Sequence, residues 1–146
     1  MRNIRFAFAT DKNHQFADKS FSIADNFQFY EYKVDNSELN LTSEVANPSL
    51  AVADENKYSC LIDFLNENKI DLLVARNYSA KLKMECQYFV PIIIDRQLPV
   101  EQICSLVKKH IRWLADELSL NKKENMVFNI TNGIYKYKID NENIIT

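Results

Sequence analysis

Three cysteines are the first residues in this sequence that could bind a metal. Cys60, Cys86 and Cys104 carry thiols, and thiolates suit both zinc and iron–sulfur clusters. Their spacings match no metal-binding motif, so we expect small, buried hydrophobic residues at most of these positions. Cys60 is the best candidate ligand among them. It is predicted to begin a helix, and the positive end of the helix dipole favours a thiolate.

The two histidines are the other candidate metal ligands. His14 lies in a polar segment after the first apolar run. Its imidazole could bind a metal, and the alternative is a solvated surface side chain. His110 falls on the apolar stripe of a predicted helix, so we expect it at the edge of the core.

Two aspartates could support metal-dependent hydrolysis. Asp11 ends the first predicted strand and Asp95 ends the fifth. Nucleases that hold two magnesium ions need clustered carboxylates. A third carboxylate is missing from this set, because Asp71 begins its strand and falls at the opposite end. A turn-capping role for Asp11 is therefore preferred. Since no nucleophile triad, phosphate loop or dinucleotide fingerprint occurs either, no enzyme is predicted.

Length and charge narrow the class of protein further. The chain has 146 residues, which suits one domain with one core. A formal net charge of −2 gives no bulk attraction to nucleic acid or to anionic membranes. No apolar run approaches the roughly 20 residues that a membrane helix needs, and the start of the chain does not resemble a signal peptide. We expect a soluble, cytoplasmic protein.

Glycine is almost absent from the chain. The sequence has one glycine, Gly133, where average usage of about 7% would give roughly ten. Residues 1–132 therefore contain no position at which a left-handed backbone is easily adopted.

Hydrophobic periodicity predicts the elements that must position these residues. Short apolar or alternating runs are typical of strands, and they occur at residues 4–9, 27–34, 38–46, 70–75 and 89–94. Helical spacing is found at 57–69 and 79–88, and in a single long helix that begins at Pro99 and extends to about residue 118. Ser59 could help to cap the first helix. Pro91 suggests that the fifth strand lies at a sheet edge.

The order of these elements predicts an α/β fold. Short connections indicate antiparallel pairing in the first half of the chain, and strand–helix–strand steps indicate parallel pairing in the second half. The sum is a mixed sheet of about five strands with helices on its faces. A terminal hairpin is predicted at 126–130 and 134–139, around Asn132-Gly133. This hairpin could pack on its own domain, extend the sheet edge or pair with a second copy of the chain.

Two segments carry a resemblance to a known family. Residues 20–32, SFSIADNFQFYEY, resemble the HFG-x-A-x-x-F-x-I-Y-x-V segment of the dinitrogenase iron–molybdenum cofactor biosynthesis family, of the NifX and NifB C-terminal type. Residues 70–81, IDLLVARNYSAK, resemble its V-D-V-V-I-A-G-G-M-G-x-R segment. Asn47-Pro48 and the opening IRFAFATD also fit the pattern.

The resemblance spans about residues 2–118 and implies a ribonuclease-H-like fold with a mixed five-stranded sheet. It divides the chain into a NifX-like domain, 1–120, and a linker with a hairpin extension, 121–146. It also implies binding of an iron–sulfur or iron–molybdenum cluster, or of a precursor, for delivery or for storage.

The resemblance implies a ligand site built from two loops. Its cofactor-binding positions correspond here to Asp11, Ser20, Phe21, Ser22, Arg76, Asn77 and Ser79. Ser20 stands where the family has histidine, and the remaining departures replace glycines: Ser22, Arg76, Asn77 and Ser79. A glycine loop lets the backbone approach an anionic cluster, whereas Arg76 could hold an anion through its guanidinium.

The sequence therefore favours a non-enzymatic binding domain with a divergent ligand loop. In one version it carries a metal cluster, and in another it binds a different ligand in the same cleft. The alternative is an interaction domain that dimerises through the hairpin or an edge strand. A hydrolase that uses Asp11 and Asp95 is the least favoured interpretation.

Overall fold

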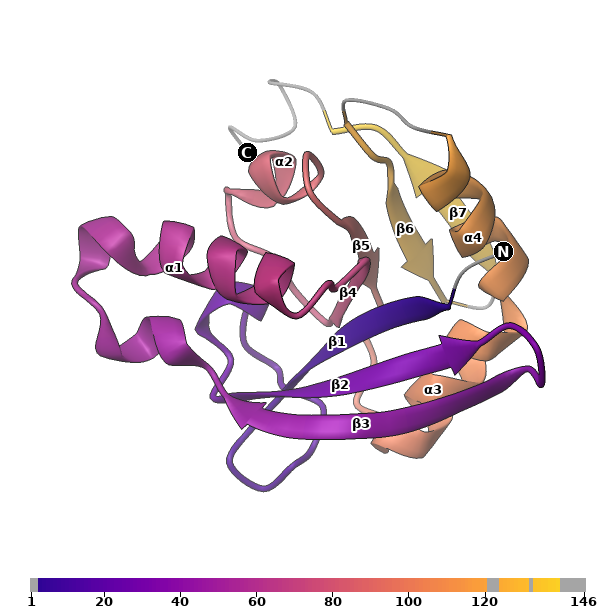
Figure 1. Ribbon diagram of the computed structural model, residues 1–146, viewed down its shortest axis with the longest axis horizontal. Helices are drawn as coiled ribbons and strands as arrows, with labels where there is room; N and C mark the ends of the chain where they lie inside the picture. The colour runs from indigo at the N-terminus through magenta and orange to yellow at the C-terminus, as the bar shows by residue number, and fades with distance from the viewer. Residues whose placement is uncertain (1–2, 121–123, 132, 140–146) are drawn as a thin grey trace.

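A single mixed sheet runs through the computed structural model of the protein, which describes residues 3–120, 124–131 and 133–139. In this part of the chain the sheet has seven strands, in the order β3-β2-β1-β4-β5-β6-β7 (Figure 1). The strands are β1 (Ile4–Thr10), β2 (Asn26–Lys33), β3 (Glu38–Ala46), β4 (Leu72–Ala75), β5 (Val90–Ile93), β6 (Val127–Ile130) and β7 (Ile134–Tyr137).

The pairing pattern confirms the mixed α/β sheet and corrects its size. β1, β4, β5 and β6 are parallel, whereas β2, β3 and β7 run antiparallel to their neighbours. The predicted hairpin forms and joins the sheet, because Ile92 pairs with Phe128 and Ile93 with Asn129. The sheet therefore has seven strands rather than five. The predicted turn residue Asn132 and residues 121–123 of the linker lie outside the described residues.

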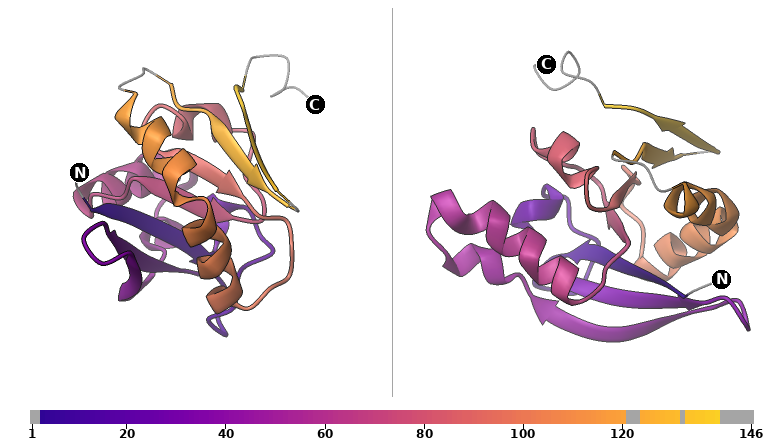
Figure 2. Two further views of the ribbon diagram at one scale, coloured as in Figure 1. Left: turned by 90° about the vertical axis from the view of Figure 1, so that its right-hand side faces the viewer. Right: turned by 45° about the horizontal axis from the view of Figure 1, so that its top comes forward.

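Helices cover both faces of this sheet. The α-helices are α1 (Asp54–Glu67), α2 (Leu82–Glu85), α3 (Val100–Lys109) and α4 (Ile111–Ser119), and two short 3-10 segments are η1 (Phe21–Ile23) and η2 (Pro48–Ala51). α1 lies on one side of the sheet, and α3 and α4 follow one another on the other side (Figures 1 and 2). No helix of the described residues is long and apolar enough to cross a membrane.

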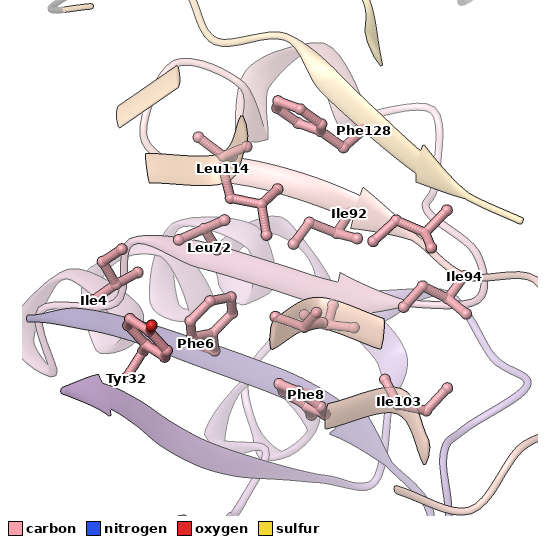
Figure 3. Packing of buried hydrophobic residues seen from close by; sticks show 14 of the residues in the cluster. Ile4, Phe6, Phe8, Tyr32, Leu72, Ile92, Ile94, Ile103, Leu114 and Phe128 are labelled. Atoms are coloured by element: carbon pink, nitrogen blue, oxygen red, sulfur yellow. The ribbon is translucent and has the colours of Figure 1, made fainter. Parts of the chain in front are cut away.

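Alternation along the central strands builds a core on each face. Phe6 and Phe8 of β1 pack with residues of α3 and α4, while Ala7 and Ala9 face the cluster that contains α1. Figure 3 shows the first cluster, in which side chains from β1, β4, β5 and β6 meet Ile103 and Leu114 of the helices. Large residues on one face and small residues on the other leave room for α1, which brings Leu61 and Leu65 to the sheet.

Pro91 does not mark a sheet edge, contrary to the sequence prediction. β5 lies between β4 and β6. Val90 and Ile94 donate their backbone N–H groups to β4-side carbonyls, at 3.0 Å each. Alternate residues of a strand point their N–H groups in opposite directions, so the Pro91 nitrogen faces β6. Pairing with β6 begins only at Ile92, so the missing N–H of Pro91 costs no ladder hydrogen bond to β6 either.

Two helix predictions also need correction. The predicted single helix after Pro99 breaks at His110, whose φ of −110° and ψ of 19° separate α3 from α4. The first helix begins at Asp54, ahead of the predicted start, with Ala53 as its N-cap. Ser59 is therefore inside α1, where its hydroxyl donates to the Asn56 carbonyl at 3.2 Å, and it caps nothing.

The scarcity of glycine does not prevent left-handed turns. His14, Ser37 and Lys69 have φ values of 63°, 57° and 57°, a conformation that costs an L-residue about 1 kcal/mol or more. Lys69 follows the C-cap of α1 and forms a Schellman motif: it donates to the Asn66 carbonyl at 3.0 Å, and Ile70 donates to the Leu65 carbonyl at 3.1 Å.

Candidate functional site

The two loops that carry the predicted cofactor-binding residues meet beyond the carboxyl ends of β1 and β4. Ser20 forms an isolated parallel bridge with Asn77, and Phe21 donates its backbone N–H to the Asn77 carbonyl at 3.0 Å. The Asn77 side chain donates in turn to the Asp18 carbonyl at 2.9 Å. Because parallel strands end at the same edge, their following loops are brought together there. Ser20, Phe21 and Asn77 therefore fasten the loops to each other.

An apolar pocket of about 330 Å³ opens beside this junction. Two of the predicted site residues, Ser22 and Ser79, line it from opposite loops. Its other walls come from η1, η2, the first two turns of α1 and residues 80–81. The apolar lining consists of Ile23, Leu50, Tyr58, Leu61 and Ala80.

Asn47 holds two walls of this pocket in place. Its side-chain amide donates to the carbonyls of Ser22 at 3.0 Å and Ala24 at 2.9 Å. Its oxygen accepts from the backbone N–H of Ser49 at 3.0 Å and from the Ser49 hydroxyl at 2.7 Å. All four bonding positions of a buried side chain are thus satisfied, and η1 is fixed to η2.

Stacked aromatic rings anchor the two loops that border the pocket. The Phe21 ring stacks on Phe27, with centroids 4.8 Å apart, and on Tyr78, with centroids 5.9 Å apart. The Tyr78 hydroxyl donates to the Ile92 carbonyl at 3.0 Å. Phe21 is fully buried, so it acts as a structural anchor and not as a ligand contact.

The charged side chains of the pocket leave one positive charge uncompensated. Lys57 pairs with Asp54 at 3.5 Å. The Lys81 ammonium lies 4.8 Å above the centre of the Tyr58 ring and has no carboxylate partner among the described residues. Burial raises the pKa of Tyr58 well above its usual value, so its phenol stays neutral. It donates to the Lys81 carbonyl at 3.3 Å.

Arg76 and Asp11 are positioned away from this pocket. The guanidinium of Arg76 donates to the Gln97 side chain at 2.8 Å and pairs with Asp95 at 3.4 Å. Asp11 closes a turn, because one of its carboxyl oxygens accepts from the backbone of Asn13 at 2.8 Å and of Gln15 at 3.0 Å. Both aspartates of the hydrolase interpretation therefore have partners already.

His14 lies at a second cleft, of about 430 Å³, on the side of the sheet that carries α3. Residues 97–101 form the opposite wall. The imidazole is exposed and pairs with Glu44 of β3. His14 therefore contacts Glu44 and is separate from the pocket of Ser22 and Ser79.

The cysteines do not gather into a metal site. Cys60 is the seventh residue of α1 and not its first, so the predicted helix-dipole effect is lost, and it does not line the pocket. Burial raises the pKa of Cys86 to about 12 and that of Cys104 to about 11, which keeps both as neutral thiols. Among the described residues, no group of three His, Cys, Asp or Glu side chains could hold a metal ion.

Glu85 is a buried acid that the sequence did not indicate. Its side chain is 1% exposed, and both carboxyl oxygens lack a hydrogen-bond partner in the described part of the chain. Burial raises its pKa from 4.5 to about 8. A glutamate in a short polar helix is ordinarily exposed. Because the burial of Glu85 depends on packing between α2 and distant segments, the local sequence gives no sign of it.

No protein-family model matches this chain, and no curated protein matches it at a significant level.

Proposed function

We propose that this chain is a non-enzymatic binding domain of the iron–molybdenum cofactor biosynthesis type, and that its ligand lies in the pocket lined by Ser22 and Ser79. The observation that carries the proposal is the junction between Ser20, Phe21 and Asn77. Two segments that resemble one family at separate places in the sequence also border one pocket.

The order of the strands supports a ribonuclease-H-like fold, which is part of this proposal. The run β3-β2-β1-β4-β5, with β2 antiparallel to β1 and with β4 and β5 parallel, agrees with the ribonuclease-H-like sheet that the resemblance implies. In this interpretation the hairpin of β6 and β7 is an addition to a five-stranded core.

The pocket suits a ligand other than a metal cluster. Its polar groups are serine hydroxyls, one carboxylate and two lysine ammonium groups. Iron–sulfur clusters are held mainly by thiolates and imidazoles, and none of these lines the pocket. We therefore favour the version of the proposal in which the cleft takes a different small molecule.

Fluorescence of a neutral apolar dye tests this site. N-phenyl-1-naphthylamine is expected to bind the folded protein, and Ala80→Trp is expected to abolish binding, because an indole on the lining residue Ala80 would take up much of a pocket of about 330 Å³ and leave too little space for the dye. Matched circular dichroism and melting curves should establish that the variant folds. Dye binding that Ala80→Trp leaves unchanged would refute the site, whereas iron and visible charge-transfer absorption after anaerobic purification would restore the cluster version.

The interaction alternative has one observation of its own. The sheet ends in exposed strands on both sides, where Leu41 of β3 is 50% exposed and Tyr135 of β7 is 52% exposed. Exposed edge strands can pair with another copy of the chain. Light scattering of Leu41→Lys and Tyr135→Lys tests this: a dimer that either variant dissociates would support the interaction domain, and a wild-type monomer at all concentrations would exclude it.

A further inference from the structure

The charge and shape of the pocket lined by Ser22 and Ser79 indicate which chemical class of ligand it can bind. The pocket is bounded by aliphatic and aromatic side chains, and two of them, Ile23 and Leu50, are 51% and 41% exposed. Covering exposed aliphatic side chains in a concave site with an apolar group removes apolar surface from water, and this favours binding. The volume of about 330 Å³ lies near the lower end of the range for small-molecule sites, so the ligand is of metabolite size.

Lys81 supplies the polar part of the recognition. Its ammonium is exposed and lies against the ring of Tyr58 at 4.8 Å, at the wall formed by residues 79–81. The second lysine, Lys57, is neutralised by Asp54. The lining therefore carries one net positive charge, which is located on Lys81.

We infer that the pocket binds a small organic acid, with its apolar body between Ile23, Leu50 and Leu61 and its anionic group on the ammonium of Lys81. This inference rests on the proposed function, because it assigns a ligand class to the same site. Tyr58 connects the two parts: its ring is apolar lining, and it also holds the Lys81 main chain through its hydroxyl.

Pre-organisation supports a specific site over a passive hollow. Asn47 fixes the walls that carry Ile23 and Leu50 through four hydrogen bonds. The opposite wall is fixed by the Ser79 hydroxyl, which accepts from the Lys81 backbone at 3.2 Å. Walls that are already ordered reduce the entropy that binding has to overcome.

A matched pair of dyes separates the acid from the apolar body. Anilinonaphthalene sulfonate carries an anionic group, and N-phenyl-1-naphthylamine is its neutral counterpart. Lys81→Gln should weaken the anionic dye about 3- to 10-fold, the range expected for one partly exposed charge-assisted contact, and leave the neutral dye unchanged. Lys108→Gln changes the net charge equally but lies on α3, across the sheet, and it should affect neither dye.

Competition then tests the acid itself. Octanoate should displace the anionic dye at lower concentration than octanol does, and Lys81→Gln should remove that difference. An unchanged anionic dye in Lys81→Gln, equal losses for both dyes, or equal effects of Lys81→Gln and Lys108→Gln would overturn the ligand class. If Ala80→Trp still abolishes binding of the neutral dye, those outcomes refute the organic acid as ligand but keep the pocket as the binding site. Failure of the ligand class and failure of the proposed function are therefore distinguishable.

Discussion

Replacing Glu85 with glutamine removes an ionisable group from the interior and keeps its shape. The wild-type carboxyl is 1% exposed and has no hydrogen-bond partner in the described residues, and its pKa rises from 4.5 to about 8 because burial penalises the charged form. At neutral pH the folded protein therefore holds a proton that the unfolded chain has released. Glutamine imitates the protonated acid at every pH.

The sign of the effect follows from this difference in bound protons. Below pH 4.5 both the folded and the unfolded states are protonated, and the stability contribution of the group is fully present. Between 4.5 and about 8 only the folded state holds the proton, so stability falls as pH rises. Each pKa unit corresponds to about 1.4 kcal/mol, so the loss across this window is on the order of 4 kcal/mol. That is a large share of a typical domain's 5–15 kcal/mol.

Urea unfolding at pH 5, 6, 7 and 8.5 measures this loss. The free energy of unfolding of Glu85→Gln minus that of the wild type should increase by about 4 kcal/mol from pH 5 to 8.5, because contributions from all other groups cancel. Glu67→Gln is the matched control. Glu67 is exposed at the end of α1, and its difference should stay flat. A flat difference for Glu85→Gln as well would mean that the carboxylate ionises in the folded protein, and it would refute the reasoning.

Two further substitutions test the pocket wall and the glycine-poor turns. Asn47→Ala removes four hydrogen bonds from a buried side chain and should lower the free energy of unfolding by about 3 kcal/mol, as measured by urea denaturation; a loss below 1 kcal/mol would show that η1 and η2 are held otherwise. Lys69→Gly relieves a φ of 57° in the Schellman turn and should raise the melting temperature, with a gain of about 0.5–1 kcal/mol. A destabilised Lys69→Gly would show that the lysine side chain contributes more than the strain costs.

The local elements were predictable from the sequence because their signals are short-range. The apolar run at residues 4–9, the alternation at 27–34 and the Asn132-Gly133 signal identify β1, β2 and the hairpin. A side-chain period reports which face of an element is buried, and a turn residue reports a backbone angle; both depend only on neighbours in the chain. The mixed pairing followed from connection lengths in the same way.

Contacts between distant segments decided the rest. Pro91 is tolerated in a central strand only because of where β6 begins to pair. The seven predicted cofactor-binding residues are divided among the pocket, the loop junction, the Asp95 ion pair and a local turn. No local pattern specifies that division, because it depends on the directions in which two loops more than 50 residues apart leave the sheet.

The sequence by itself determined that the fold is of the α/β class. It also identified the two loops that would carry a ligand site and showed that they contain no glycine. The tertiary structure alone decided that Ser22 and Ser79 border one pocket, that Cys60 does not line it, and that Glu85 is shielded from water. Burial and side-chain direction are properties of packed neighbours, so a residue's chemistry is settled only when the sheet has brought those neighbours together.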